Sequence, residues 1–307
     1  MEYGIKKSLI RIVVILATIA GIVNAGCSSV KPPASESLPD KFDYTKRLYN
    51  AEEYQDAIME LQKLTYMSRA TEYEDDVLFY LAQSYYKSEQ YLLALDTYKR
   101  LVRNVPGTPY TKTVYFQIAM SYYNMSPVWS LDQEYTKLAI QQFQIFIDGY
   151  PAPDSSEVAE QIAELKSHVE KDSSNQRYTS TLQKVKNQYG LLDTLKKAEN
   201  YIQICREKLA HKTFETAEQY VRLRAYKAAG IYYDEVILGY SDSPYYERAL
   251  LGKIDVLVTR KKWDEALIAI EKYEELFPNK LDQVKSVHKE VKEALADTSK
   301  SQVSNTN

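Results

Sequence analysis

The chain has 307 residues, of which 45% are hydrophobic and 26% are charged, so most of it is expected to fold. Only 9 glycines are present, which suits helices joined by short turns and argues against a protein built of strands and turns. A net charge of −3 is too small, and of the wrong sign, for a protein that binds nucleic acid through its phosphates. The 28 tyrosines stand out, because an apolar ring with a polar tip suits surfaces that bind other proteins.

Residues 1–26 have the pattern of a lipoprotein signal peptide. Lys6, Lys7 and Arg11 precede an apolar run from Ile12 to Ala25, which is too short to cross a bilayer as a helix. The run ends in small residues directly before Cys27, as a cleavage site does.

The junction Val23-Asn24-Ala25-Gly26-Cys27 resembles a bacterial lipobox, which implies cleavage before Cys27 and acylation of its thiol and its new amino end. Asn24 departs from the usual aliphatic residue, and the alternative is an ordinary signal followed by a chance cysteine. Ser28 rather than Asp follows the cysteine, which by the same resemblance implies an outer-membrane location on the periplasmic face of a Gram-negative cell. Several acyl chains would make a lasting anchor, and residues 27–40 would be a flexible tether.

A spacing of 37 residues organises the segment after the tether. It is marked by three phenylalanines and three tyrosines, namely Phe42, Phe79, Phe116, Tyr49, Tyr86 and Tyr123. A fixed period of this length indicates stacked supersecondary units.

The second of these units shows the type of repeat most clearly. Its first helical face is Leu78, Leu81, Ala82 and Tyr85, and its second is Ala94, Tyr98 and Leu101, followed by Pro106. Small residues let two helix axes approach, and large residues one turn away fill the grooves. This is the tetratricopeptide (TPR) pattern, so the sequence predicts an all-α fold, an α-solenoid of five TPR helix pairs with an inserted helical hairpin.

The second-helix alanines give the domain organisation, at Ala57, Ala94, Ala139, Ala229 and Ala266. Units 1–3 are expected in residues 41–153, with about eight extra residues inside the third pair. The step of 90 to the fourth unit predicts a helical insertion at 154–197, broken near Tyr189-Gly190. Units 4–5 and a capping helix follow in 198–297, and 298–307 is expected to be a disordered tail.

Two surfaces are candidates for binding proteins. An aromatic stripe on the first helices is expected to line a peptide groove, with the candidates Phe42, Tyr49, Phe79, Gln83, Tyr86, Phe116 and Tyr123. The alternative is that neighbouring helices cover this stripe as core. A basic turn could meet an acidic partner, with the candidates Arg260, Lys261, Lys262 and Trp263, although such a run is more often only a solvated turn.

The sequence lacks the patterns of an enzyme. His168, His211 and His288 lie in separate segments and do not have metal-ligand spacing, and there is neither a glycine-rich phosphate loop nor a nucleophile elbow. Cys205 lies in a helical pattern as a small buried hydrophobe. We therefore expect no catalytic residue, no metal and no cofactor.

Signal, lipobox, tether and repeat together resemble the BamD family of outer-membrane assembly lipoproteins. The more specific segments are Ala82-Gln83-Ser84-Tyr85-Tyr86-Lys87, Leu131-Asp132-Gln133-Glu134-Tyr135-Thr136, Ala139-Ile140, Phe143-Gln144-Ile145-Phe146-Ile147 and Glu207-Lys208-Leu209-Ala210. The resemblance covers about Asp40 to Phe277, apart from the insertion. Leu131 stands where many members carry arginine, so the role of that charge does not transfer.

The resemblance implies a subunit of the β-barrel assembly (BAM) machinery that folds and inserts outer-membrane proteins. The first units would receive the targeting strands of unfolded β-barrel proteins, the last would dock on a BamA-like barrel protein, and other assembly lipoproteins would be further partners. The membrane would be met only through the lipid anchor. The alternatives are a TPR scaffold lipoprotein that organises cell-envelope or division enzymes, or a pilotin of a secretion or pilus system.

Overall fold

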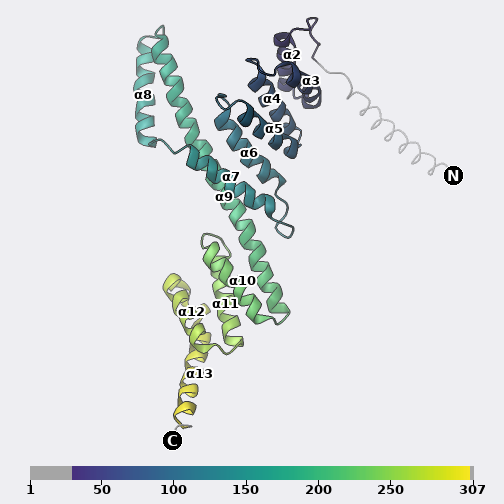
Figure 1. Ribbon diagram of the computed structural model, residues 1–307. Coiled ribbons are helices and arrows are strands. Elements are labelled where there is room, and N and C mark those ends of the chain that lie inside the picture. Colours follow the sequence, from purple (N-terminus) through teal and green to yellow (C-terminus); the bar gives the residue numbers. More distant parts are fainter. Residues whose placement is uncertain (1–29, 305–307) are drawn as a thin grey trace, which may run out of the picture. The chain divides into compact units, whose positions relative to one another are not determined.

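The computed structural model describes residues 30–304, with side chains described up to 297 (Figure 1). All regular structure in this part of the chain is helical, as the sequence predicts. The helices are α2 (Leu38–Asn50), α3 (Tyr54–Met67), α4 (Glu74–Lys87), α5 (Tyr91–Asn104), α6 (Thr111–Met125), α7 (Glu134–Gly149), α8 (Ser155–Lys171), α9 (Gln176–Arg222), α10 (Tyr226–Gly239), α11 (Tyr246–Thr259), α12 (Trp263–Leu276), the 3₁₀ helix η1 (Pro278–Gln283) and α13 (Lys285–Ser304).

These helices divide into two compact units, each of which holds several of the helix pairs. The first unit ends at Ser121 and the second begins at Tyr122, inside α6. In the first unit α2 packs on α3, α3 on α4, and α4 on α5, so consecutive helices form antiparallel neighbours. Ala57 and Ala94 are completely buried, as expected where a small residue lets two helices approach. Tyr98 and Leu101, one and two turns beyond Ala94, are also completely buried and fill the space beside it.

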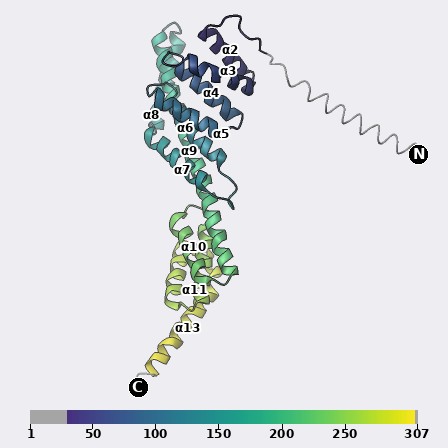
Figure 2. The same ribbon diagram turned by 45° about the vertical axis from the view of Figure 1, so that its right-hand side comes forward.

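The second unit holds the remaining helices. The segments α7, α8 and α10 all pack against α9, and the chain continues through α10–α11, α11–α12 and α12–α13 contacts. Figure 2 shows α8 beside the first part of α9, while α10 lies further along the same helix. Phe214, Ala217, Ala229 and Tyr233 form one core cluster between α9 and α10.

The turn inside the helix pairs has one repeated geometry. Glu52 and Glu89 in the first unit, and Arg224 and Lys261 in the second, all have a positive φ of 56–62°. Each pair of positions is 37 residues apart, and in each case the next residue donates its backbone N–H across the helix end, as Gln90 N does to Tyr85 O at 2.9 Å. This is the left-handed C-cap that glycine usually occupies. The 37-residue period is therefore a period of turn conformation as well as of side chains.

The third pair lacks this turn and has a longer loop. The helix α6 ends at Met125 and α7 begins at Glu134, so eight residues, 126–133, connect them. The length of this connection agrees with the extra residues expected from the sequence.

Two sequence expectations need correction. The predicted break at Tyr189-Gly190 is wrong, because α9 is one continuous helix of 47 residues. A glycine costs a helix only about 1 kcal/mol, and buried Val185 and Leu195 on either side hold the helix in place. The expected boundary between 197 and 198 therefore lies within α9, whose last turns serve as the first helix of the fourth pair.

The second correction concerns the carboxyl end. The helix α13 runs to Ser304, so residues 298–304 of the expected disordered tail are helical. Lys300 and Gln302 in this stretch favour a helix, and no glycine or proline stops it.

Candidate functional site

In the first unit, three of the groove candidates contact Tyr80, a residue that lies outside the 37-residue pattern. Tyr80 makes edge-on contacts with Phe42 (ring centroids 5.7 Å apart), Tyr49 (5.3 Å) and Phe79 (5.8 Å). Phe79 in turn stacks on Tyr110 at 3.9 Å. Tyr80 has no aromatic counterpart 37 residues away, so the periodicity could not reveal it.

The exposure of these rings differs along the cluster. Phe42 is only 5% exposed, so its side chain belongs to the hydrophobic core and does not line an open groove. Tyr49, Phe79, Tyr86 and Phe116 are half-buried, so each keeps an accessible edge. Gln83, another groove candidate, is 8% exposed. Burial, followed by the neighbouring Tyr54 and Tyr80, raises the pKa of the Tyr49 phenol.

The turn before α6 is tied back to the start of α4. The Tyr110 hydroxyl donates to Asp76, and the Thr108 hydroxyl donates to Asp75 at 3.0 Å. Burial is the first cause that raises the pKa of Tyr110, followed by its bond to Asp76. These bonds hold the Tyr110 ring against Phe79 and give this aromatic surface a fixed floor.

The last groove candidate, Tyr123, lies in the second unit. Its ring meets Tyr201 of α9 at 4.6 Å, and Tyr201 stacks on Phe143 of α7 at 5.4 Å. Tyr123 is half-buried, so within this unit it forms part of the packing between the end of α6, α7 and α9.

The loop 126–133 is fastened to α9. The Lys208 ammonium donates to Ser126 Oγ at 2.7 Å and to Pro127 O at 3.1 Å, and Lys212 donates to Leu131 O at 2.7 Å. Gln133, which is 3% exposed, donates from Nε2 to two carbonyls of the loop and accepts from Thr136 Oγ1 at 2.7 Å. Two segments that carry the family resemblance, Leu131–Thr136 and Glu207–Ala210, are thereby brought into one structure.

A pocket with a volume of about 480 Å³ opens between this loop, α9 and the turn before α11. The His211 ring lies between Trp129, at 4.2 Å, and Tyr245, against which it stacks at 4.9 Å and 9°. Val128 on the loop is 63% exposed and Ile204 on α9 is 36% exposed. An apolar, aromatic pocket with accessible walls is suited to receive a side chain of another protein. Sequence reasoning missed Trp129, His211 and Tyr245 because they come from three distant segments.

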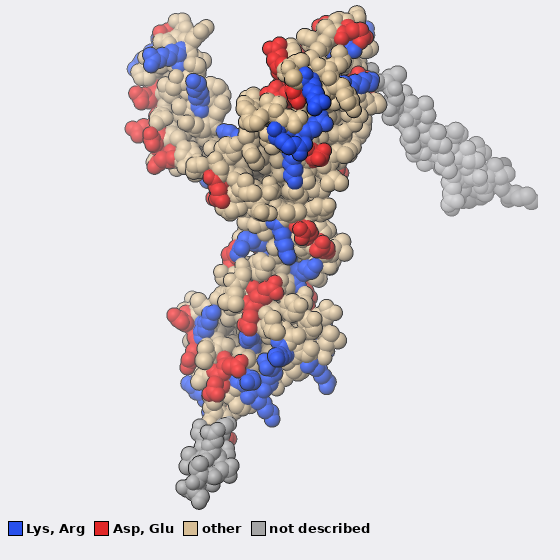
Figure 3. Space-filling model, viewed as in Figure 1, with Lys and Arg blue, Asp and Glu red and all other residues tan. Residues whose placement is uncertain are grey.

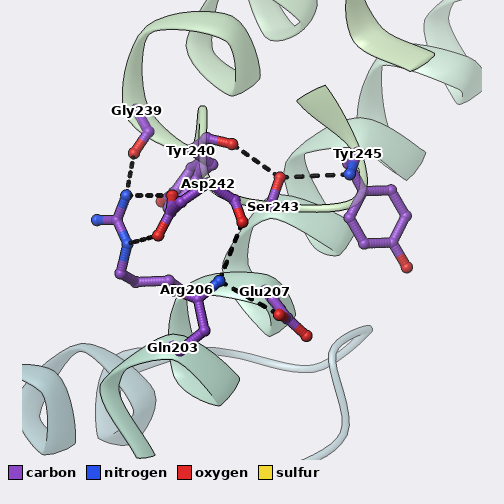
Figure 4. Close-up of polar contacts among 8 residues, drawn as sticks. All are labelled: Gln203, Arg206, Glu207, Gly239, Tyr240, Asp242, Ser243 and Tyr245. Atoms are coloured by element: carbon purple, nitrogen blue, oxygen red, sulfur yellow. Dashed lines mark hydrogen bonds and ion pairs between the residues drawn. The ribbon is translucent and has the colours of Figure 1, made fainter. Parts of the chain in front are cut away.

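A polar cluster holds the turn before α11, which forms the wall of this pocket at Pro244 and Tyr245 (Figure 4). Arg206 makes a two-pronged bond to Asp242, with Nε to Oδ2 at 2.8 Å and Nη2 to Oδ1 at 2.6 Å, and Nη2 also donates to Gly239 O. Gln203 donates to Asp242 O at 3.0 Å, and Ser243 Oγ donates to Tyr240 O. The bond to Arg206 lowers the pKa of Asp242.

This polar cluster positions the turn before α11 against α9. It fixes residues 239–243 on α9, so the Pro244 and Tyr245 that follow stay beside His211. Planar two-pronged pairs of this kind give geometric definition beyond that of a single charge contact.

Part of the basic turn between α11 and α12 is already engaged in contacts within the chain. Arg260, Lys261 and Lys262 form the α11–α12 turn, Lys261 has φ 56°, and Lys262 Nζ lies 3.4 Å from Glu265 Oε1. Trp263 is partly buried and packs against the core of α11, α12 and α13, so its ring belongs largely to the fold.

Among residues 30–304 no helix is long and apolar enough to cross a membrane, and no cluster of potential metal ligands occurs. Cys205 is completely buried, and burial raises the pKa of its thiol to about 11. That value leaves the thiol protonated at neutral pH, which is unsuited to a nucleophile. Cys27 and the signal segment lie outside the described residues.

Paired helices, with a spacing of 37 residues within each half of the array, define a helical-repeat protein of the tetratricopeptide type. Residues 38–173 match the family model of the YfiO outer membrane lipoproteins. This match agrees with the resemblance of the sequence to the BamD family of outer-membrane lipoproteins, and it covers slightly less than half of the chain. The match includes the loop 126–133 and α8, and thus the first half of the expected insertion, but it stops before α9.

Comparison with curated protein sequences finds no match. Solved structures with similarity include the P58(IPK) TPR domain (14% identity, TM-score 0.32, 85% of this chain and 66% of that structure), so this chain spans slightly less than two thirds of it. A thermophilic TPR protein of Thermus thermophilus has 13% identity and a TM-score of 0.31 over 85% of this chain and 100% of that one. A TPR protein of Parabacteroides merdae has 13% identity and a TM-score of 0.32 over 85% and 99%.

Proposed function

We propose that this outer membrane lipoprotein is anchored through Cys27 and serves as a non-enzymatic subunit of the β-barrel assembly machinery. In that role it binds a BamA-like barrel protein and the targeting strands of unfolded outer-membrane proteins. The observation that carries the proposal is the family match over 38–173, because it includes both the aromatic first unit and the loop 126–133.

The first unit is the proposed receptor for the targeting strand. Tyr49, Phe79 and Tyr86 keep accessible edges while Tyr80 and Tyr110 hold them in place from behind. Rings that are already fixed lose little conformational freedom when a peptide binds, which favours affinity. In this arrangement Phe42 supports the surface from beneath and makes no contact with the strand.

The second unit is the proposed docking side for the barrel protein. The pocket of Trp129, His211 and Tyr245 offers an aromatic site for an apolar anchor residue, and such anchors dominate protein interfaces. The basic turn at Arg260 and Lys261 would add charge at the rim, where it affects the rate of association more than the affinity.

Co-purification from native membranes tests the whole proposal. The full lipidated chain, isolated in mild detergent from cells that express it at its natural level, is expected to bring a BamA-like barrel protein with it. Depletion of the chain should lower the amounts of all outer-membrane β-barrels together. Co-isolation of cell-wall enzymes without a barrel protein would instead identify a scaffold, and loss of a single secretion ring would identify a pilotin.

The groove is tested separately with the variant Tyr49→Ala/Tyr86→Ala. We expect weaker crosslinking to the carboxy-terminal peptide of a β-barrel protein and little change in the melting temperature. Tyr189→Ala is the matched control, because Tyr189 is 51% exposed and lies on the hairpin. Unchanged crosslinking together with a lower melting temperature would show that these tyrosines serve the core.

A further inference from the structure

The first unit has a second apolar surface that the proposed groove does not use. It is a cleft of about 760 Å³ between α3 and α5, with Leu81 and Tyr85 of α4 at its floor. Met59 and Tyr66, seven residues apart, face it from α3, and Leu93 and Arg100, also seven apart, face it from α5. Residues seven apart on a helix lie about 10.5 Å from each other on one side.

The apolar side chains at this cleft are unusually accessible. Tyr66 is 87% exposed, Met59 is 54% exposed and Leu93 is 47% exposed. The floor is ordered, because Gln62 Nε2 lies 2.6 Å from the Tyr85 hydroxyl. Single exposed apolar residues are ordinary, but several around one cleft with a fixed floor indicate a binding surface.

Positive charge lies at one end of the same cleft. A smaller adjoining hollow shares Tyr66 and Arg100 and extends to Arg69. Neither guanidinium takes part in an ion pair among the described residues. Glu74 lines the same hollow and accepts from Ala70 N at 2.7 Å, and Asp96 and Lys63 line the larger cleft, where Lys63 pairs with Glu60. Figure 3 shows Lys and Arg side chains on this unit, with Asp and Glu side chains beside them.

We propose that this cleft, formed by Met59, Tyr66, Leu93, Arg69 and Arg100, binds an acidic amphipathic helix of a partner protein. Two helical walls with apolar contacts every two turns match the i, i+3 or i+4, i+7 spacing of a helix laid in a groove. The partner's apolar face contacts Met59, Tyr66 and Leu93, and its carboxylates meet the two arginines. Both arginines lie near the carboxyl ends of α3 and α5, so the acidic residues of the ligand gather at one end.

The second unit supplies a comparison for the charge. Counting from the buried alanines, Arg100 corresponds to Glu235 on α10 and Lys272 on α12, while Met59 corresponds to Ile231 and Ile268. Exposed apolar residues recur at the positions of Met59, since Ile231 is 60% and Ile268 67% exposed. Arginine does not recur at the position of Arg100, where the second unit has Glu235 and Lys272. The selectivity for acidic helices is therefore assigned to the α3–α5 cleft.

Fluorescence anisotropy with a designed peptide tests this assignment. The probe is a labelled helical peptide of about 14 residues, with leucines at helical spacing and glutamates elsewhere, titrated with the full chain in detergent micelles. We expect binding that weakens as salt is raised, and at least about tenfold weaker binding for Arg69→Glu/Arg100→Glu and for Tyr66→Ala. Lys272→Glu reverses one charge at the position of α12 that corresponds to Arg100, and it should leave the affinity unchanged.

Three results would overturn the proposal. They are equal binding of a version with lysine in place of glutamate, equal loss with Lys272→Glu, or retained binding by the arginine variant. Vesicles that contain phosphatidylglycerol provide a further comparison. If the arginine variant loses vesicle binding but not peptide binding, the face meets lipid headgroups and the proposal is wrong. All substituted side chains are exposed at least in part, so circular dichroism and the melting temperature should stay unchanged.

Discussion

The ammonium group of Lys208 on α9 lies 2.7 Å from the hydroxyl of Ser126, which begins the loop between α6 and α7. The same ammonium also reaches Pro127 O, so one side chain fixes the start of a loop that is 82 residues away in the sequence. This contact joins the family-specific loop to the long helix and shapes the pocket around His211.

Lys208→Ala should loosen that loop. A charged hydrogen-bond donor to partly buried acceptors contributes about 1.5–3 kcal/mol, so we expect a loss of this order in the free energy of unfolding and faster amide exchange in 126–133. Urea denaturation and hydrogen exchange measure the two effects. Lys184→Ala, an exposed lysine elsewhere on α9, is the control and should change neither.

Asp242→Asn should reduce stability in a way that depends on pH. The bond to Arg206 lowers the pKa of Asp242 below 3.8, so the folded state favours the ionised carboxylate. The stabilisation is therefore fully present above pH 3.8 and is lost as pH falls through the lower, folded-state pKa. Because both side chains are partly exposed, we expect only about 0.5–1 kcal/mol at neutral pH. The difference between Asn variant and parent should shrink in acid, and a constant difference would contradict this account.

Gly252→Ala should destabilise the second unit strongly. A Cβ at this position would lie 2.7 Å from the Tyr233 hydroxyl, inside the packing of α10 on α11. Overpacking of this kind costs about 1–3 kcal/mol, which a thermal melt would show as a lower midpoint. Gly239→Ala is the matched control, because nothing lies within 4 Å of its Cβ position. Equal melting temperatures for the two variants would contradict the prediction.

Glu89→Gly should raise stability although it removes a side chain. Glu89 has φ 61°, and the left-handed conformation costs an ordinary residue about 1–2 kcal/mol, more than the about 0.5–1 kcal/mol by which glycine's extra freedom disfavours folding. The expected net gain is a few tenths to about 1 kcal/mol in urea denaturation. Lys87→Gly, two residues earlier within α4, should instead destabilise by about 1 kcal/mol.

Cys205 should resist alkylation in the folded chain. Its thiol is completely buried, and burial raises its pKa to about 11, so little thiolate forms near pH 8. Iodoacetamide labelling followed by mass spectrometry of the peptide that contains Cys205 should give negligible modification until urea unfolds the second unit. Rapid labelling under native conditions would show that α9 opens locally around this residue.

The sequence by itself determined the helical class, the 37-residue period, the loop inside the third pair and the resemblance that the family match over residues 38–173 supports. These follow from local rules: the spacing of apolar residues on a helix, small residues where helices cross, and proline after four of the five pairs. The same rules failed at Gly190, because the modest cost of one glycine is smaller than the packing on either side of it.

Only the tertiary structure decided which of these residues meet. The Phe42 ring became core because Tyr80, which lies off the repeat phase, covers it, and the pocket at His211 exists because Lys208 and Arg206 hold two distant turns on α9. Periodicity reports which face of a helix a residue occupies. It does not report what lies opposite that face, because the contacts there depend on segments brought together only when the chain folds.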